Sequence, residues 1–206
     1  MTHTHRATGS RTPHGIRDHA THAPRETASK HVRVLTGDVV ASSTSLILDA
    51  VLGSCVAVCL HDPLLEIGGM NHILLPGSST DQTCSRYGVH AMELLINELM
   101  KLGADRRRLL AKAFGGVNVL ADLKTTRIGD INVRFVRQFL ETEGIQLIAA
   151  KFGGKQAMHV LFRTDSGKAI VRTVGDDRLP SIAHDETAYL RVHATDEYTS
   201  GDVTLF

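Results

Sequence analysis

The sequence predicts an α+β fold in which two helices cover one face of a mixed β-sheet while further strands pack elsewhere. Short aliphatic and β-branched runs occur before, between and after two segments with helical periodicity, and this alternation carries the prediction. The chain has 206 residues, of which 42% are hydrophobic, so it can bury one sizeable core. We therefore expect one folded domain.

Four strands are expected in the first half of the core region, over residues 33–41, 46–50, 56–60 and 67–75. The run at 56–60 is β-branched and apolar, which is typical of a buried strand. The pair Asp62-Pro63 predicts a turn after this run, and Pro76-Gly77 ends the strand that follows. The last two strands are therefore expected to form a hairpin-like return.

Two amphipathic helices are expected next. The first has Ser85 as its N-cap, Gly103 at the C′ position, and a series of apolar residues at helical spacing. These apolar residues are Val89, Met92, Leu95, Ile96, Leu99 and Leu102. The second helix covers residues 129–143 and ends at Gly144.

Three further strands are expected after the helices, over residues 145–151, 158–163 and 168–173. The sequence between the last two, at residues 164–167, resembles a tight turn, so it predicts a second hairpin.

Composition divides the chain into three parts. Residues 1–30 are rich in His, Thr and Arg and almost lack large aliphatic side chains. Such a segment cannot bury enough apolar surface to offset the entropy that it would lose on folding, so we expect a disordered tail. Residues 31–173 hold nearly all of the apolar periodicity and form the predicted folded domain. Residues 174–206 are acidic with sparse aliphatic residues, and we expect an extension that packs weakly or frays.

The charge balance argues against two classes of partner. A formal net charge of +1 gives the chain no overall attraction to nucleic acid or anionic lipid. No apolar run approaches the ~20 residues that a membrane span needs, and residues 1–30 lack the apolar core of a secretory signal. Three cysteines, an odd count, favour a reducing compartment, so we expect a cytoplasmic protein with free thiols.

Cys55 is the strongest candidate for chemistry. It follows Gly53-Ser54 and precedes an apolar run, and His72 lies a short excursion further along the chain. An adjacent imidazole would raise the thiolate fraction of a cysteine whose ordinary pKa is ~8.5. The glycine turn can also aim the amides of Ser54 and Cys55 at a developing oxyanion. This pattern predicts acyl transfer, with Cys55 as nucleophile and His72 as base.

Other interpretations of these residues stay open. Cysteine is among the residues most often buried, so Cys55 can be a core residue, as we expect Cys59 to be. A zinc site formed by Cys55, Cys59, His61 and His72 is disfavoured, because no paired CxxC spacing occurs and an alternating strand does not bring all four together. The tail histidines lack a regular spacing and are not expected to hold a metal. They are His3, His5, His14, His19 and His22.

The segments VLGSCVAVCLHDP at 51–63 and IGGMNHILLP at 67–76 closely resemble CheD, the family of bacterial chemoreceptor glutamine deamidases. The joint GSC and GGMNH pattern is specific. The resemblance covers residues 32–173, because further matching segments follow in the family's order and spacing. They are RYGVHAMELLIN at 86–97, KAFGG at 112–116, IGDINV at 128–133 and the glycines at 153–154.

The resemblance implies a layered α/β/β sandwich similar to that of toxin-type cysteine deamidases. It also implies a hydrolase that converts selected glutamine side chains of methyl-accepting chemotaxis receptors to glutamate without a cofactor. The family's nucleophile falls on Cys55 and its histidine on His72. In such a reaction the thiolate attacks the carboxamide, the histidine protonates departing ammonia, and activated water hydrolyses the thioester.

Three positions depart from the family's pattern. The family commonly has a threonine about six positions before the cysteine, where this chain has Asp49. Asp49 either orients His72, as a carboxylate does in a catalytic triad, or is a solvent-facing acid at a strand end. The family also tends to carry Asn and Arg where this chain has Lys155 and Met158, so the substrate contacts there are expected to differ.

Two glycine pairs of the matching segments, at 115–116 and 153–154, allow two interpretations. Each pair either permits close backbone approach to the site or forms a turn.

The resemblance also leaves a second class of function open. Members of the family regulate CheC-type phosphatases, so the alternative is a binding module for such a phosphatase, with catalysis weakened or lost through the change at Asp49.

Overall fold

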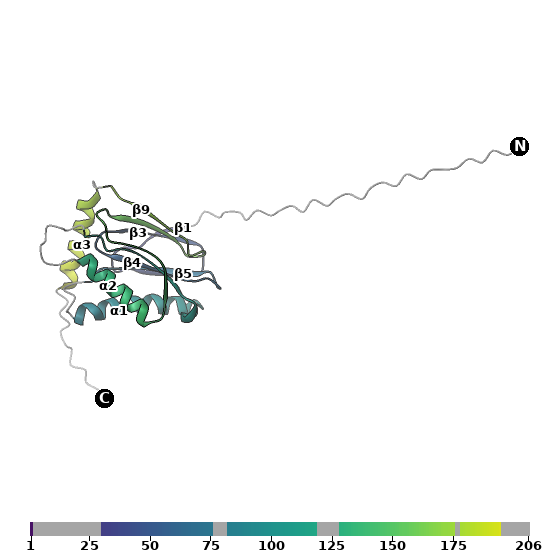
Figure 1. Ribbon diagram of the computed structural model, residues 1–206, viewed down its shortest axis with the longest axis horizontal. Coiled ribbons are helices and arrows are strands. Elements are labelled where there is room, and N and C mark those ends of the chain that lie inside the picture. Colours follow the sequence, from purple (N-terminus) through teal and green to yellow (C-terminus); the bar gives the residue numbers. More distant parts are fainter. Residues whose placement is uncertain (2–29, 76–81, 119–127, 176–177, 195–206) are drawn as a thin grey trace, which may run out of the picture.

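The computed structural model describes residues 1, 30–75, 82–118, 128–175 and 178–194, which form two β-sheets and three α-helices (Figure 1). The predicted tail lies outside these residues except at its two ends, as does Pro76-Gly77. The larger sheet has the strand order β2-β5-β4-β6-β7, with β2 Val39–Ser42, β5 Ile67–Ile73, β4 Val56–Asp62, β6 Leu110–Gly115 and β7 Gln146–Phe152. The smaller sheet has the order β1-β3-β8-β9, with β1 Lys30–Arg33, β3 Leu46–Leu52, β8 Met158–Arg163 and β9 Ala169–Thr173.

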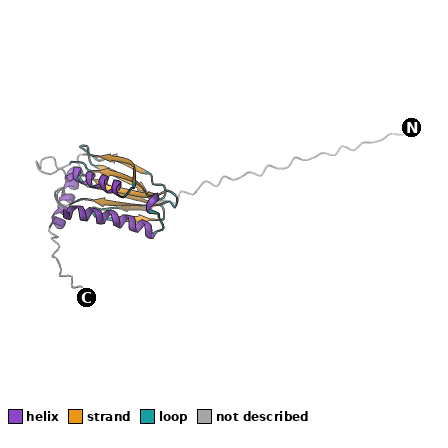
Figure 2. Cartoon of the chain, turned by 60° about the horizontal axis from the view of Figure 1, so that its bottom comes forward, coloured by secondary structure: helices purple, strands orange, loops and turns teal. Residues whose placement is uncertain are grey.

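The fold has three layers. Helices α1 (Gln82–Lys101) and α2 (Ile128–Thr142) cover one face of the five-stranded sheet, and the four-stranded sheet covers its other face (Figures 1 and 2). A third helix, α3 (Leu179–Ala194), lies at one end of the sandwich (Figure 1). The predicted α+β class and the layered α/β/β arrangement are therefore confirmed.

Strand β4 shows why the layers form. Val56, Val58 and Leu60 belong to the core between the large sheet and the helices, whereas Ala57 and Cys59 belong to the core between the two sheets. Successive side chains of a strand point to opposite faces, so an almost wholly apolar strand buries both of its faces. All seven residues of β4 except His61 are buried. The strand that the sequence predicts as buried is thus the centre of the sandwich.

Most of the predicted elements are confirmed within a few residues. They are the β4–β5 hairpin, both amphipathic helices, β7, and the β8–β9 hairpin. Gly103 and Gly144 adopt positive φ angles of 105° and 65° after α1 and α2, as C′ glycines do. Both sheets are mixed, because β1 pairs with β3, and β6 with β7, in parallel, whereas the other neighbours are antiparallel.

Four elements differ from the sequence prediction. The single strand expected at 33–41 is two strands, β1 and β2, which belong to different sheets because the chain turns between layers at Gly37, where φ is 91°. Helix α1 begins at Gln82, so Ser85 lies inside the helix and is not its N-cap. Strand β6 occupies a segment for which the sequence predicts only a glycine motif. Helix α3 is absent from the prediction.

The predicted C-terminal extension is ordered over α3. The acidic Asp185 lies on the exposed side of this helix, while Ile182 and Glu186 are 9% and 2% exposed and Tyr189 packs against the core. These inward residues lie four and three positions apart, which places them on one helix face. Within the extension, α3 therefore packs through this face, whereas composition predicts a segment that packs weakly or frays.

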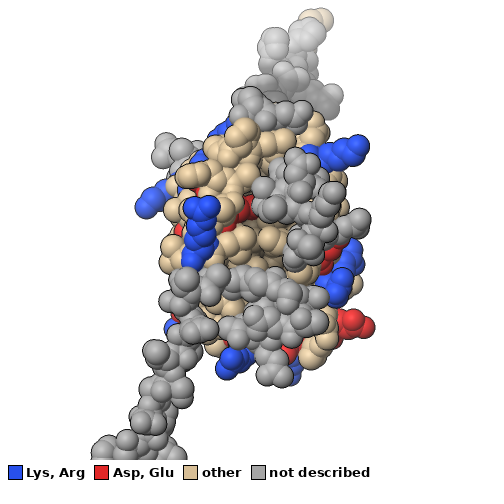
Figure 3. Space-filling model, turned by 90° about the vertical axis from the view of Figure 1, so that its left-hand side faces the viewer, with Lys and Arg blue, Asp and Glu red and all other residues tan. Residues whose placement is uncertain are grey.

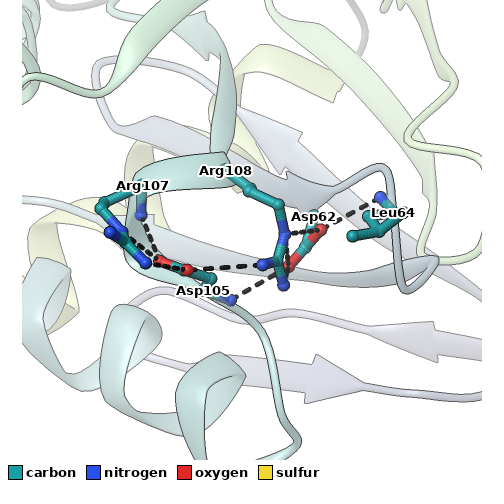
Figure 4. Close-up of polar contacts among 5 residues, drawn as sticks. All are labelled: Asp62, Leu64, Asp105, Arg107 and Arg108. Atoms are coloured by element: carbon teal, nitrogen blue, oxygen red, sulfur yellow. Dashed lines mark hydrogen bonds and ion pairs between the residues drawn. The ribbon is translucent and has the colours of Figure 1, made fainter.

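At the far end of β4 a cluster of ion pairs ties the β4–β5 turn to the segment after α1 (Figure 4). The Asp62 carboxylate, which is fully buried, accepts hydrogen bonds from the Arg108 guanidinium, with the shortest at 2.7 Å. It also accepts from the amides of Leu64 and Asp105 at 3.0 Å. This charged cluster stabilises the end of the sandwich opposite Cys55.

None of the helices that the structure describes is both long and apolar enough to span a membrane.

Candidate active site

Cys55 and His72 meet where β4 begins and β5 ends. In the antiparallel pairing of these strands, His72 lies opposite Ala57, so Cys55, two residues before Ala57, is its diagonal neighbour on the same face. The Cys55 Sγ atom lies 2.8 Å from His72 Nε2. The hairpin register therefore assembles the thiol–imidazole pair that the sequence predicts.

A short loop between β1 and β2 fixes the histidine ring. His72 Nδ1 lies 3.0 Å from the carbonyl oxygen of Val34. A carbonyl can only accept a hydrogen bond, so Nδ1 carries the proton and Nε2 presents its lone pair to the thiol. The backbone of the same loop also binds the backbone of His72. Gly37 N–H donates to the His72 carbonyl, and His72 N–H donates to the Asp38 carbonyl. The ring is thus held in the tautomer that a general base needs.

The carbonyl groups of the Gly53–Cys55 turn are all bound by neighbouring groups. Val117 N–H donates to Gly53 O at 2.7 Å, Asn132 Nδ2 donates to Ser54 O at 2.9 Å, and Gly116 N–H donates to Cys55 O at 2.7 Å. Asn132 is fully buried and comes from α2. With its carbonyls bound in this way, the turn holds the Cys55 thiol directly before the first residue of β4.

The two glycine pairs differ in role. A Cβ atom on Gly115 would overlap the Cys55 carbonyl oxygen, so this glycine permits close backbone approach beneath the nucleophile. Gly153 and Gly154 have φ angles of 69° and 100°, and a Cβ on either would meet nothing within 4 Å. Gly115 therefore belongs to the scaffold of the site, whereas Gly153 and Gly154 supply positive φ angles directly after β7.

Glu186 of α3 reaches into the same site. Ser54 Oγ donates to Glu186 Oε2 at 2.6 Å, and Cys55 N–H donates to Glu186 Oε1 at 3.3 Å. Glu186 is 2% exposed, and a buried carboxylate requires such partners. Sequence reasoning missed this residue, whose position 131 residues after Cys55 leaves no local motif.

The electrostatic environment keeps both members of the pair neutral. Burial raises the pKa of the Cys55 thiol well above its usual range, and the nearby Glu186 carboxylate raises it further. Burial also lowers the pKa of His72. In this conformation the pKa of the thiol is therefore raised although the imidazole is adjacent.

The structure places Asp49 away from His72. Asp49 lies on β3, where its carboxylate is 3.1 Å from His159 Nε2 and 3.6 Å from the Arg33 guanidinium. The Nδ1 position that a triad carboxylate would occupy is filled by the Val34 carbonyl. Asp49 was one candidate for orienting His72. A backbone carbonyl orients the ring instead.

A hydroxyl group does lie beside the histidine. Thr36 Oγ1, in the same loop as Val34, is 3.5 Å from His72 Nε2. No sequence motif singled out this residue, because it lies 36 positions before His72. The Thr36 hydroxyl and the Val34 carbonyl are thus the neighbours of the imidazole, in place of the Asp49 carboxylate.

The other candidate residues differ in burial. Cys59 is fully buried between the two sheets, as predicted. Met158 is 2% exposed within β8, and Lys155 is exposed. In the part of the chain that the structure describes, no group of three or more His, Cys, Asp or Glu side chains is placed to hold a metal ion. The tail histidines lie outside that part.

The chain is similar to known proteins over most of its length. Residues 74–173 match the family model described as CheD chemotactic sensory transduction. A protein of Stenotrophomonas maltophilia named "Probable chemoreceptor glutamine deamidase CheD" is 44% identical over 160 residues, covering 77% of this chain and 80% of the relative. A protein of Cupriavidus pinatubonensis with the same name is 42% identical over 195 residues, covering 90% and 89%.

Among solved structures, the crystal structure of a Bacillus licheniformis hypothetical protein, YfiH, superposes with a TM-score of 0.37 and 15% identity over 55% of this chain and 50% of that chain. This likeness is too distant to inform the fold or the function. The identity and coverage of the curated relatives, by contrast, are decisive, and the chain belongs to the CheD family.

Proposed function

We propose that this chain deamidates glutamine side chains of methyl-accepting chemotaxis receptors, with Cys55 as the nucleophile and His72 as the acid–base residue. One observation carries the proposal, namely the 2.8 Å contact between Cys55 Sγ and His72 Nε2 in a ring whose Nδ1 is already bound. The names of the relatives supply the substrate class.

The reaction follows from the positions of these atoms. His72 Nε2 takes the thiol proton as Sγ attacks the glutamine Cδ, and the carbonyl oxygen becomes an oxyanion. The Cys55 amide and the Ser54 hydroxyl are the donors that stand beside the sulfur, and both can stabilise this charge. His72 then returns its proton to the nitrogen, the C–N bond breaks, and ammonia leaves a thioester.

Hydrolysis completes the cycle. His72 Nε2 removes a proton from water, the oxygen adds to the thioester carbon, and the C–S bond breaks as His72 returns this proton to the sulfur. The products are a glutamate side chain and the original thiol. Every proton and electron pair is accounted for by Cys55, His72, water and the substrate, so the proposed reaction requires no cofactor.

The test uses the full chain and a receptor cytoplasmic fragment. Each converted glutamine raises the mass of the fragment by about 1 Da, which peptide mass spectrometry locates. We expect conversion by the wild type and none by Cys55→Ala, while Cys59→Ala, which removes a thiol from the core between the sheets, retains activity in the folded protein. Equal activity of the wild type and Cys55→Ala would refute the assignment.

The binding-module alternative predicts a different result. A chain that only regulates a CheC-type phosphatase would bind that phosphatase and leave receptor glutamines unchanged. It would also stay inactive after Asp49→Thr, the substitution that restores the family's residue. The assembled thiol–imidazole pair favours the enzyme.

A further inference from the structure

Helix α3 packs over the end of the sandwich where the candidate site lies (Figure 1). Ile182 is buried in a small cluster with Ala157 and Val174. One helical turn further on, Glu186 contacts the Ser54-Cys55 turn. The helix thus reaches the nucleophile from a segment that lies outside the predicted catalytic domain.

The same helix also contacts the loop that holds His72. A Cβ atom on Gly37 would lie 3.0 Å from the Tyr189 hydroxyl, so the tyrosine ring packs directly on this loop. Tyr189 is also hydrogen bonded to Tyr87 of α1. Glu186 and Tyr189 therefore place α3 against both halves of the site, and Cys55 is only 1% exposed beneath it.

The partners of the Glu186 carboxylate are those expected for a reacting carbonyl. It accepts from one backbone amide and one hydroxyl, both adjacent to the sulfur, and none of the ion pairs among the described residues involves it. A carboxylate bound beside a nucleophile by neutral donors occupies the position in which an oxyanion would be stabilised. Its chemical group is also the product of glutamine deamidation.

We propose that α3 is an intramolecular product mimic, in which Glu186 fills the subsite for the substrate's glutamine side chain and keeps the site closed until the helix moves away. This inference rests on the proposed deamidase function and adds a mode of regulation to it. The substrate must then compete with a covalently attached glutamate, so activity depends on displacing α3.

The electrostatics agree with a closed, inactive state. The groups that face Cys55 are the Glu186 carboxylate and the His72 ring, and Asp38 acts on the ring from the loop side. The Glu186 charge disfavours a second negative charge on the sulfur, in addition to the effect of burial. Departure of α3 would remove both the cover and this repulsion.

A glutamine at position 186 provides a direct test. In Glu186→Gln, the carboxamide would lie where the substrate's carboxamide reacts. We expect Cys55 Sγ to bond to its Cδ with release of ammonia, and water to hydrolyse the thioester to regenerate glutamate. Residue 186 should gain about 1 Da at a rate independent of protein concentration. The double variant Cys55→Ala/Glu186→Gln controls for spontaneous deamidation and should retain the amide.

Alkylation of the thiol tests the closure separately. In the full chain, Glu186→Ala should raise the rate of Cys55 alkylation by iodoacetamide roughly tenfold or more, because the site opens more often. Asp185→Ala is the matched control, since it removes an exposed carboxylate from the same helix. Cys59, fully buried in the core, should stay unlabelled in both variants and thereby reports that the domain remains folded.

The outcomes separate this inference from the proposed function. If the wild type deamidates receptor fragments while the Glu186→Gln variant keeps its new amide, the product-mimic inference is overturned and the enzyme assignment stands. If the amide of Glu186→Gln is converted but receptor glutamines are not, the product-mimic inference stands and the proposal that receptors are the substrate is refuted. Equal Cys55 alkylation in Glu186→Ala and Asp185→Ala would show that α3 does not restrict the site.

Discussion

The Nδ1–H group of His72 donates to the carbonyl oxygen of Val34 at 3.0 Å, and this bond determines what the other ring nitrogen can do. Because Nδ1 holds the proton, Nε2 is free to accept the thiol proton of Cys55 from 2.8 Å. A backbone carbonyl carries no full charge, so it orients the ring without stabilising an imidazolium as strongly as a carboxylate would. The His72 ring is also buried, which lowers its pKa and disfavours its protonated form.

Replacement of His72 by alanine should lower the deamidation rate by about 10²–10⁴-fold, the usual contribution of a positioned acid–base group. The variant removes both the base for the thiol and the acid for ammonia. Initial rates on a receptor fragment, followed by peptide mass, measure the effect. A loss of less than about tenfold would argue that another group carries the proton.

The pH dependence of kcat/KM should show an acid limb below pH 6.5. Catalysis needs neutral His72, and burial lowers the pKa of this residue from its ordinary value of 6.5. The neutral form therefore persists as the pH falls past 6.5, and activity is lost only at lower pH. An acid limb at or above 6.5 would mean that the ring is more easily protonated than its burial implies.

Substitution of Thr36 by valine should reduce kcat about 3–10-fold with little change in KM, since one hydrogen bond near His72 is worth about 1 kcal/mol. The Thr36 hydroxyl lies 3.5 Å from Nε2 and acts through the histidine as a positioning residue. Thr36→Ser retains the hydroxyl and should restore kcat. Equal rates for the valine and serine variants would leave no role for this hydroxyl.

Much of the fold could be predicted because its signals are local. The periodicity of α1 and α2, and the apolar run of β4, each require only one segment of sequence. The division of residues 33–41 between two sheets could not be predicted, because the extended pattern continues on both sides of the turn at Gly37. Helix α3 was missed because the composition of residues 174–206, acidic and with few aliphatic residues, outweighs the pattern of the helix itself.

The site shows the same contrast. Cys55 and His72 were predictable because a glycine turn and a hairpin place them in adjacent motifs. The Val34 carbonyl is a backbone group and leaves no mark on side-chain chemistry. Glu186 could have been noticed only from its spacing with the apolar residues of its helix, since its partners are 131 and 132 residues away. Contacts that depend on tertiary approach are thus the ones that sequence reasoning missed.

Described side chains of both charges lie on the side of the molecule where α3 is found. Figure 3 views the side of the molecule on which α3 lies in Figure 1, and the acidic and basic side chains that it shows are interspersed. This agrees with the formal net charge of +1 for the whole chain.

Gly115→Ala should destabilise the protein more than Gly153→Ala. Both glycines have positive φ angles, 114° and 69°, so each alanine adds a backbone strain of about 1–2 kcal/mol. At Gly115 the new Cβ would also overlap the Cys55 carbonyl oxygen, whereas at Gly153 it meets nothing within 4 Å. Urea unfolding of the two variants isolates the cost of the clash. Similar free energies of unfolding would contradict the packing beneath Cys55.

Asp62→Asn should destabilise the protein at neutral pH, and the difference from the wild type should vanish in acid. Hydrogen bonds from Arg108 hold the pKa of Asp62 at about 2, below its ordinary 3.8. A depressed pKa contributes stability above 3.8 that is lost as the pH falls toward 2. The neutral amide loses the charged partner at all pH values, at a cost of about 1–3 kcal/mol at pH 7.

Urea unfolding of both proteins between about pH 7 and pH 2 measures this linkage. The two free energies of unfolding should converge between about pH 4 and pH 2, where wild-type Asp62 itself becomes neutral. Asp185→Asn, which also turns a carboxylate into an amide but at an exposed position, is the matched control. A constant difference across the whole range would mean that the Arg108 pair does not stabilise the end of the sandwich opposite Cys55.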